Sequence, residues 1–276
     1  SDVFMFNLCH LPFSTRTAIL KPHAREEICM TTVATIQARM GSTRLPGKVL
    51  LPLGGGYVLE QVVDRVARAK RIDAVVVATS TQRADDLIAQ LAPTFGAQVH
   101  RGSETDVLAR LSDAARAAAA THMVRITADC PYIDPVVIDA VIERALTTGA
   151  DYTSNTLERS FPRGSSVEVC TMDSLATVLA EATEPHHREH VTPYYREHPE
   201  RFSLASVTAA DVLADPAHQG RTDCRITLDE ADDYRLLRAV DRHLPDAATA
   251  SLPAVIDTID AHGLASINAH VQQKAV

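Results

Sequence analysis

The sequence lacks the features that mark membrane-spanning, secreted and nucleic-acid-binding proteins. The sequence of 276 residues contains no run of roughly 18 apolar residues, the length that a transmembrane helix needs. The five cysteines are scattered without a C-x-x-C pair, which favours a reduced, cytoplasmic setting. The net charge is −8, so no general basic field attracts a nucleic-acid backbone or an anionic membrane. Any polyanion that the protein binds must therefore be small and held locally.

Two well-known phosphate-binding motifs are also missing. A Walker loop has four residues between its glycines and a Ser or Thr after the Lys. Here five residues separate Gly41 from Gly47, and Val49 follows Lys48. The G-x-G-x-x-G fingerprint is absent, and the "LGGG" run at 53–56 lies away from a strand end. The sequence thus excludes a P-loop ATPase and disfavours a hydride-transfer enzyme.

What is present is a regular alternation of short β-rich runs and helical stretches. The expected strands lie at 32–38, 74–80, 97–102 and 123–129, and the expected helices at 58–71, 84–95, 106–120 and 135–149. Strand, helix, strand at this spacing predicts an α/β fold with a mostly parallel sheet flanked by helices on both faces.

The alternation of strands and helices is interrupted in the second half of the chain. Strand-like pieces at 150–155, 165–171 and 202–207 are separated by loops, and we interpret about 151–221 as an inserted arm. A strand at 224–228 and a helix after it restore the pattern, and one more helix at 251–263 closes it.

The first 29 residues show neither the helical nor the strand periodicity of apolar residues. We interpret residues 1–29 as a tail or upstream extension that carries no fold, and expect its removal to leave stability unchanged. A single domain then runs from 30 to 276.

A glycine-containing turn with three cations follows the first expected strand. In "ARMGSTRLPGK", Gly41 and Gly47 allow backbone conformations closed to other residues, and Arg39, Arg44 and Lys48 add positive charge. A strand end, a flexible turn and cations are a usual arrangement for gripping phosphates. A surface loop with incidental cations is the alternative.

Two aspartates stand at expected strand ends. Asp129 ends the strand in "RITADCP", and Asp229 ends the one in "RITLDEADDY". Ligands of open α/β sheets gather at such ends, and carboxylates commonly hold Mg²⁺ there. Each also has a structural alternative, because Asp229 precedes a helix that it could cap and Asp129 could cap the next turn.

The segment "IQARMGSTRLPGKVL" resembles the signature turn of the sugar-acid cytidylyltransferases, with a closer likeness to the SpsF-like branch of spore-coat polysaccharide biosynthesis. The match continues in order through "VVVATS", "VHRGSETDVLAR", "VRITADCPYIDP", "REHVTPYYREHPERF" and "RITLDEADDYRLLRAV", and covers about residues 31–272. The resemblance implies a Rossmann-like nucleotidyltransferase fold, CTP as donor, Mg²⁺ as cofactor and a small acidic acceptor.

The resemblance also implies roles for individual residues. Lys48, Arg39 and Arg44 would act in catalysis, and Asp129 and Asp229 would bind the metal. Nucleotide contacts would come from Ala38, Gly41, Ser42, Gly47, Thr79, Arg101, Gly102 and Ser103, and acceptor contacts from Arg188, Glu189 and His190. For Ser103 and Asp106 a helix start is an equally good interpretation, and for 188–190 a solvated helix face. We expect Lys48 to point to solvent when the site is empty.

The arm also predicts a homodimer. Its strand-like segments need a partner surface for their apolar sides, and Tyr194, Tyr195 and Phe202 are candidates for burial between subunits. His186 and His190, at i and i+4, could bind zinc in principle, but no third ligand is obvious nearby. Cys130 is expected to be a small buried thiol.

Three other functions compete with CMP transfer to a sugar acid. Secondary-metabolite pathways use CMP transfer to a phosphonate. A nucleotide-sugar glycosyltransferase on a related scaffold would need a D-x-D motif, and "TADC" lacks its second Asp. A CTP sensor without turnover would have no need of Lys48, Asp129 and Asp229, all of which are present.

Overall fold

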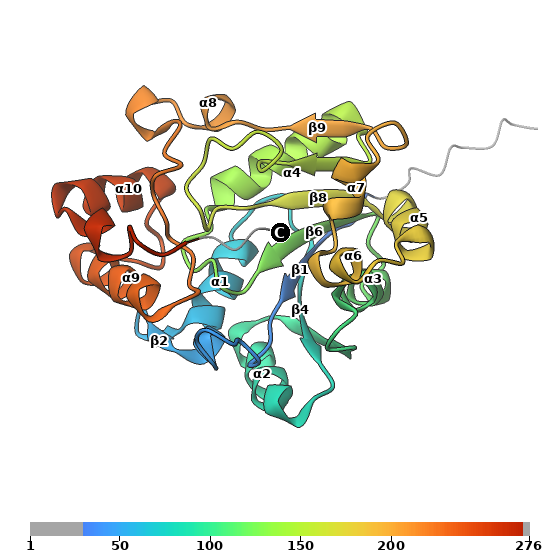
Figure 1. Cartoon of the computed structure of the whole chain (residues 1–276), viewed down its shortest axis with the longest axis horizontal. Helices are drawn as coiled ribbons and strands as arrows, with labels where there is room; N and C mark the ends of the chain where they lie inside the picture. Colours follow the sequence, from blue (N-terminus) through green and yellow to red (C-terminus); the bar gives the residue numbers. More distant parts are fainter. Residues whose placement is uncertain (1–29, 273–276) are drawn as a thin grey trace, which may run out of the picture.

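A seven-stranded sheet forms the centre of the computed structural model, which describes residues 30–272 (Figure 1). Its order is β5-β4-β1-β6-β8-β7-β9. The strands are β1 (Thr32–Gln37), β4 (Ala74–Ser80), β5 (Gln98–Gly102), β6 (His122–Thr127), β7 (Tyr152–Ser154), β8 (Glu168–Thr171) and β9 (Leu204–Ser206). Only β8 runs antiparallel to its neighbours β6 and β7, so the predicted mostly parallel α/β fold is confirmed.

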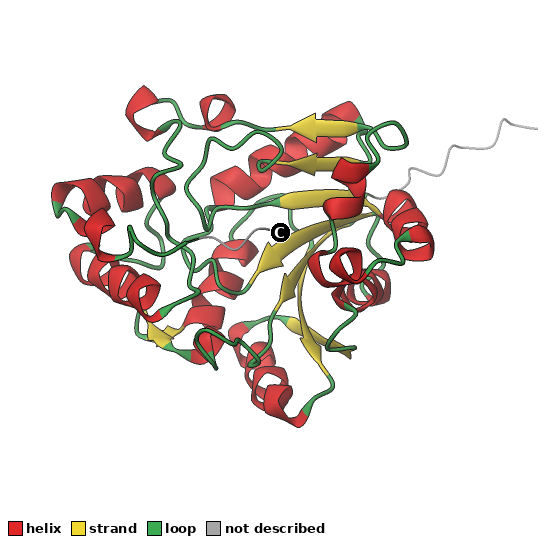
Figure 2. Ribbon diagram, viewed as in Figure 1, coloured by secondary structure: helices red, strands yellow, loops and turns green. Residues whose placement is uncertain are grey.

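Helices cover both faces of the sheet (Figure 2). They are α1 (Val58–Ala67), α2 (Asp86–Leu91), α3 (Val107–Ala117), α4 (Pro135–Thr148), α5 (Met172–Glu181), α6 (Pro185–His190), α7 (Pro193–Glu197), α8 (Ala209–Val212), α9 (Ala231–His243) and α10 (Leu252–Ala261). Short 3-10 helices lie at Lys48–Leu50, Arg83–Asp85, Ala92–Phe95, Pro216–His218 and Leu264–Ile267, and β2 (Pro52–Leu53) and β3 (Gly56–Tyr57) form a small hairpin around the "LGGG" run.

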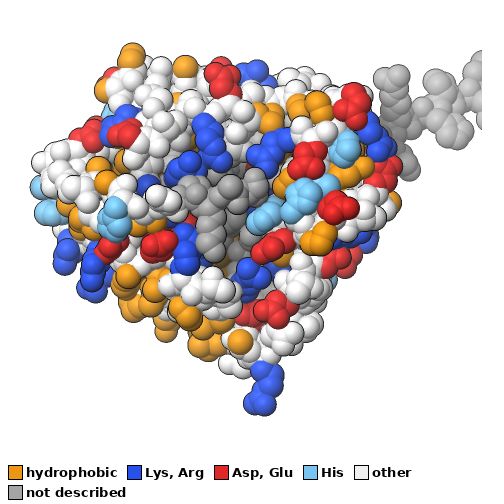
Figure 3. Space-filling view, viewed as in Figure 1, with side chains coloured by type: hydrophobic (Ala, Val, Ile, Leu, Met, Phe, Trp, Pro, Cys, Tyr) orange, Lys and Arg blue, Asp and Glu red, His pale blue; other side chains and the backbone are white. Residues whose placement is uncertain are grey.

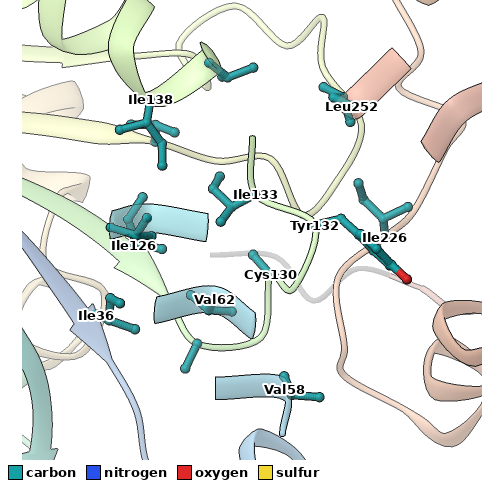
Figure 4. Close-up of a cluster of buried hydrophobic side chains, with 14 of the residues drawn as sticks. Ile36, Val58, Val62, Ile126, Cys130, Tyr132, Ile133, Ile138, Ile226 and Leu252 are labelled. Atoms are coloured by element: carbon teal, nitrogen blue, oxygen red, sulfur yellow. The ribbon is translucent and has the colours of Figure 1, made fainter. Parts of the chain in front are cut away.

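Two hydrophobic cores follow from the alternation of side chains along the strands. In β1, Ile36 packs on the side of α1 and α4, whereas Val33 packs on the side of α3. Figure 4 shows Ile36 and Ile126 of the sheet in one cluster with helix residues such as Val62. Each fully buried aliphatic side chain contributes about 1.5–3 kcal/mol relative to an exposed one.

The segment expected to be a strand at 224–228 is not one, and this prediction is wrong. Its apolar residues Ile226 and Leu228 are fully buried. Their backbone N–H groups bond to two different loops, however, at Arg163 O (2.7 Å) and at Asp129 O (2.8 Å). The β-bridge between Arg225 and Arg163 is an isolated one, outside the strands of the sheet. Alternating apolar residues therefore reflect burial here without a neighbouring strand.

The predicted arm extends the central sheet, because β7, β8 and β9 all belong to it. The aromatic residues expected to face a second subunit are buried within the chain instead. Tyr195 is fully buried, stacks on Tyr152 at 4.9 Å and contacts Phe202. Tyr194 lies in the same cluster. The apolar sides of the arm thus need no second chain, and that argument for a dimer was wrong.

The predicted tail, residues 1–29, lies outside the described residues. In the part of the chain that the structure describes, no helix combines the length and apolar character needed to cross a bilayer.

Strand order also determines where a ligand can enter. From β1 the chain moves outward through β4 to β5 and then crosses back to place β6 on the other side of β1. The carboxyl ends of β1 and β6 are adjacent, with Gln37 opposite Thr127. In open α/β sheets, ligands bind at such a reversal of strand order.

Candidate active site

A cavity of about 680 Å³ opens at the reversal of strand order. Both strand-end residues, Gln37 and Thr127, line it. Its volume is within the range of small-molecule sites, roughly 300–1,000 Å³. The predicted site residues that line it are Ala38, Arg39, Gly41, Ser42, Arg44, Lys48, Asp129, Asp229, Glu189 and His190.

The turn after β1 is held by its own backbone. Gly47 N donates to Met40 O at 3.0 Å, and Leu45 N donates to Ser42 Oγ at 3.2 Å. Gly47 has φ of 72°, a left-handed conformation that other residues adopt at a cost. Asp85 fixes the start of the turn by accepting from Met40 N at 2.7 Å. Gly47 thus shapes the turn, while Gly41 and Ser42 face the cavity.

Lys48 is the centre of the charged site. Its Nζ donates to Asp129 Oδ2 at 2.5 Å, to Asp229 Oδ1 at 2.8 Å and to Leu228 O at 2.7 Å. Burial would lower the pKa of Lys48, but the two carboxylates outweigh it and raise the pKa above 10.5. The side chain is only 12% exposed, so the prediction that Lys48 points to solvent was wrong. The reason is the pair of carboxylates, which attracts the ammonium group across the cavity.

Asp229 is held by three cations. Besides Lys48, Arg44 lies 3.0 Å from its Oδ1, and Arg225 donates to its Oδ2 at 2.8 Å. Burial would raise the pKa of Asp229, but Lys48 and the two arginines hold it below the ordinary value. The carboxylate therefore stays ionised near neutral pH.

Neither aspartate serves as a cap. Glu230 is the N-cap of α9, so the capping role considered for Asp229 is wrong. Among the described residues, the Asp129 carboxylate accepts from Lys48 Nζ and Cys130 Sγ, rather than from the backbone of the following turn. Burial raises the pKa of Cys130 to about 12, which agrees with an inert buried thiol.

A second charged cluster also lines the cavity. Arg125 of β6 pairs with Glu168 of β8, and Glu168 also accepts from Tyr152 Oη at 2.5 Å and from Thr192 Oγ1 at 2.6 Å. Burial would raise the pKa of Glu168, but the charge of Arg125 and these hydrogen bonds hold it below 4.5. Arg125, Glu168 and Thr192 line the cavity.

Three arginines of the arm also line the cavity, and the sequence analysis missed them. They are Arg159, Arg163 and Arg196. None of them forms an ion pair with a described carboxylate. Burial lowers the pKa of Arg163, and repulsion from Arg159 and Arg225 adds to this effect. The available signal was the pair of arginines in "LERSFPRG", which lies in a loop of the arm.

The residues expected to contact the nucleoside lie apart from the cavity. Thr79 is fully buried in β4, and Arg101 donates to Ser80 O at 2.9 Å while pairing with Asp86. Neither these two residues nor Gly102 and Ser103 appear among the described residues that line the cavity.

Ser103 and Asp106 build the start of α3. Ser103 Oγ accepts from Asp106 N at 3.0 Å, and Asp106 caps α3 by accepting from Ala109 N at 2.9 Å. Arg188 donates to Asp106 Oδ2 at 3.4 Å and to Leu179 O at 2.9 Å, away from the cavity that its neighbours Glu189 and His190 line.

The oxygen atoms around Lys48 Nζ are of the kind that binds a hard divalent cation. Two carboxylate oxygens and a carbonyl oxygen surround one positively charged atom within 2.8 Å. Mg²⁺ prefers oxygen ligands, and proteins commonly hold it through one or two carboxylates together with substrate phosphates. Asp129 and Asp229 thus form a chemically suitable pair.

The chain is similar to known proteins in sequence and in fold. A family model described as cytidylyltransferase matches residues 33–242. The spore coat polysaccharide biosynthesis protein SpsF of Bacillus subtilis is 34% identical over 230 residues, which cover 80% of this chain and 92% of SpsF. A 3-deoxy-manno-octulosonate cytidylyltransferase of Geobacter sulfurreducens is 40% identical over 116 residues, 41% of this chain and 44% of that protein.

Among solved structures, a cytidylyltransferase from Leptospira borgpetersenii superposes with a TM-score of 0.79 at 31% identity and covers 90% of this chain and 100% of its own. The family inferred from the turn and from the ordered motifs is confirmed. The chain belongs to the cytidylyltransferase family, whose sugar-acid members its sequence resembles.

Proposed function

We propose that this enzyme transfers the CMP group of CTP to a small acidic acceptor and releases pyrophosphate. One observation carries the proposal: a single cavity holds a carboxylate pair around Lys48 and, in addition, three arginines of the arm without a described carboxylate partner. The first group suits a triphosphate with its metal. The second suits the anionic group of an acceptor.

The turn after β1 would hold the triphosphate. Attack on the α-phosphorus increases negative charge on the attacking, bridging and leaving oxygens, so nearby cations stabilise the transition state more than the ground state. Arg39, Arg44 and Lys48 line the cavity beside the open backbone of Gly41 and Ser42. Lys48 can exchange a carboxylate partner for a phosphate oxygen, because its side chain is long and flexible.

Asp129 and Asp229 would hold a divalent metal ion, and we propose Mg²⁺. Both carboxylates lie within 2.8 Å of one nitrogen, Lys48 Nζ, so they are already directed to a common point. A bound Mg²⁺ would supply Lewis-acid charge neutralisation at the phosphates. Arg44 and Arg225 keep Asp229 ionised and oriented for this role.

The arm would bind the acceptor. Arg159, Arg163 and Arg196 come from the arm and face the same cavity as Glu189 and His190. Arginine binds carboxylate and phosphate groups through two parallel hydrogen bonds. A sugar acid agrees with the name of the 3-deoxy-manno-octulosonate relative, and a sugar with the polysaccharide pathway named for SpsF. A phosphonate would satisfy the same arginines and is the second candidate.

A homodimer and a cytoplasmic location remain predictions. Sedimentation at micromolar concentration tests the dimer, and a monomer there would remove it. A glycosyltransferase on this scaffold has less support, because the carboxylate pair comes from two separate segments at Asp129 and Asp229 instead of a D-x-D motif.

Pyrophosphate release tests the proposed function directly. The enzyme is incubated with Mg²⁺, one nucleoside triphosphate and a panel of sugar acids, phosphonates and matched neutral sugars. We expect release with CTP and an acidic acceptor only. Equal release with ATP or GTP, or with the neutral sugars, would contradict the proposal. Arg159→Ala should no longer release pyrophosphate in response to the acidic acceptor. Arg116→Ala, which changes an exposed arginine on α3, should respond as the wild type does.

A further inference from the structure

The two short helices α6 and α7 bring two histidines and a glutamate together outside the catalytic cavity. His186 Nε2 lies 3.1 and 3.4 Å from the two oxygens of Glu197, and His187 Nε2 lies 2.7 Å from Glu197 Oε2. One ligand atom from each residue lies within 4.8 Å of the others. On the face seen in Figure 3, histidine side chains gather beside acidic ones over these helices.

We propose that His186, His187 and Glu197 form a binding site for a transition-metal cation of the Zn²⁺ class. Imidazole nitrogen and carboxylate oxygen bind Zn²⁺ at about 2.0–2.2 Å, which places neighbouring ligands of a tetrahedral site about 3.3 Å apart. The separations of His186 Nε2 from the Glu197 oxygens are close to this value. Two histidines and one glutamate leave the fourth position to water, as in open zinc sites.

Burial differs among the three ligands in a way that suits metal capture. His187 is 4% exposed, and its ring packs edge-on against Tyr194 at 5.1 Å, which fixes the direction of Nε2. The side chains of His186 and Glu197 are about half exposed, 48% and 47%. One ligand is therefore held in place, while two remain open to an ion from solvent.

A hydrogen-bonded cluster without metal is the alternative. Its weakness is that a single carboxylate must then serve two imidazoles whose centroids are only 3.9 Å apart. A neutral imidazole presents a lone pair on one ring nitrogen, so one metal ion could bind both rings and the carboxylate together. His187 Nδ1 is buried without a hydrogen-bond partner among the described residues, so no second hydrogen bond supports the ring from behind. We therefore expect an affinity below that of sites with a complete outer shell.

Metal binding at this site would also affect the catalytic cavity, because the two are connected through one segment. The segment that it would cross-link carries Glu189, His190, Thr192 and Arg196, all of which line the catalytic cavity. Helices of six and five residues have little stability of their own. A metal bridge between α6 and α7 would therefore order one wall of the cavity. The metal site itself does not depend on the proposed function.

Calorimetric titration of the tag-free full chain with Zn²⁺, in excess Mg²⁺ to occupy carboxylate-only sites, tests the proposal. We expect one Zn²⁺ per chain in the wild type. His186→Ala and Glu197→Gln each remove one of the three ligands, and the affinity should fall about 100-fold or more, since even outer-shell changes cost 10–100-fold. The matched control is His270→Ala, which removes a histidine paired with a single carboxylate, Asp232 at 3.0 Å.

Hydrogen exchange provides a second measurement. Zn²⁺ bound at a fortuitous surface site elsewhere would not slow the exchange of backbone amides in this segment. Backbone amides of 185–197 should exchange more slowly with Zn²⁺ in the wild type and in His270→Ala, and not in the two ligand variants. Melting temperatures without Zn²⁺ check folding, and Glu197→Gln decides the matter if His186→Ala does not fold. Absence of Zn²⁺ binding, or wild-type binding by both ligand variants, would overturn the site.

Discussion

The two charged clusters that line the cavity are built differently. Around Lys48, the side chains of Asp129 and Asp229 remain 23% and 13% exposed. Around Arg125, the Glu168 carboxylate is 6% exposed, and its oxygens are engaged by Arg125, Tyr152 and Thr192. The first cluster can exchange partners with a ligand, whereas the second is closed. We infer that the Lys48 cluster serves the reaction and that the Arg125 cluster holds the sheet together between β6 and β8.

The largest expected effect tests the closed cluster. Glu168→Ala leaves the buried Arg125 without its counter-charge and removes the acceptor of two hydroxyl groups. Breaking a buried ion pair in this way costs about 3–5 kcal/mol of unfolding free energy. Denaturant unfolding measures the loss. The matched control is Glu181→Ala, an exposed carboxylate paired with Arg201, for which we expect a much smaller loss because solvent screens an exposed pair. Equal losses in both variants would show that the buried Glu168 pair stabilises the fold no more than an exposed pair does.

A change in the open cluster should affect the rate more than the fold. Lys48→Ala removes the cation nearest to both carboxylates, and loss of one such stabilising group commonly lowers kcat by about 10²–10³-fold. Because the variant also leaves Asp129 without its ion pair, we expect its melting temperature to fall slightly without Mg²⁺ and to recover when Mg²⁺ is added. Lys70→Ala, an exposed lysine, is the control for both measurements. A wild-type rate in Lys48→Ala would make the turn structural.

The arginines of the arm should govern the acceptor alone. Arg196→Ala removes one cation from the acceptor side of the cavity. We expect the KM for the acceptor to rise about tenfold, corresponding to about 1.4 kcal/mol, with the KM for CTP unchanged. Steady-state kinetics with each substrate varied in turn measure this split. A rise in the KM for CTP instead would assign Arg196 to the triphosphate.

The smallest expected effect is a loss of folding stability at low pH. The folded-state pKa of Glu168 lies below its ordinary value, so its contribution to stability is complete above the unfolded pKa, about 4.3, and is lost as the pH falls through the folded value. Glu168→Gln imitates the protonated side chain. The gap in denaturation midpoint between wild type and Glu168→Gln should therefore be wide at pH 7 and narrow toward pH 3. A constant gap would show that the charge of Glu168 does not stabilise the fold.

The sequence predicted best where local pattern and burial agree. The parallel strands β1, β4, β5 and β6 have apolar runs bounded by turn residues, and the structure has all four. The strand expected at 224–228 failed because alternating apolar residues report burial, whereas a strand also needs a neighbouring strand to accept its hydrogen bonds.

Site residues followed the same rule in part. Asp129 comes just after β6, so its place at the cavity could be expected from topology. Asp229 ends no strand, and the contact of Lys48 with both carboxylates was not predicted. Arg125 and Glu168 lie inside strands, and only the antiparallel pairing of β6 with β8 sets them opposite each other. That pairing joins segments 43 residues apart and has no local signal.

Pyrophosphate release by Asp129→Asn tests the central claim most directly. The substitution keeps the size of the side chain and removes one charge of the pair around Lys48. With CTP and an acidic acceptor, across a range of Mg²⁺, we predict a rate near background and a melting temperature close to that of the wild type. A wild-type rate at saturating Mg²⁺, from a variant that is equally folded, would contradict the assignment of this cluster to CMP transfer.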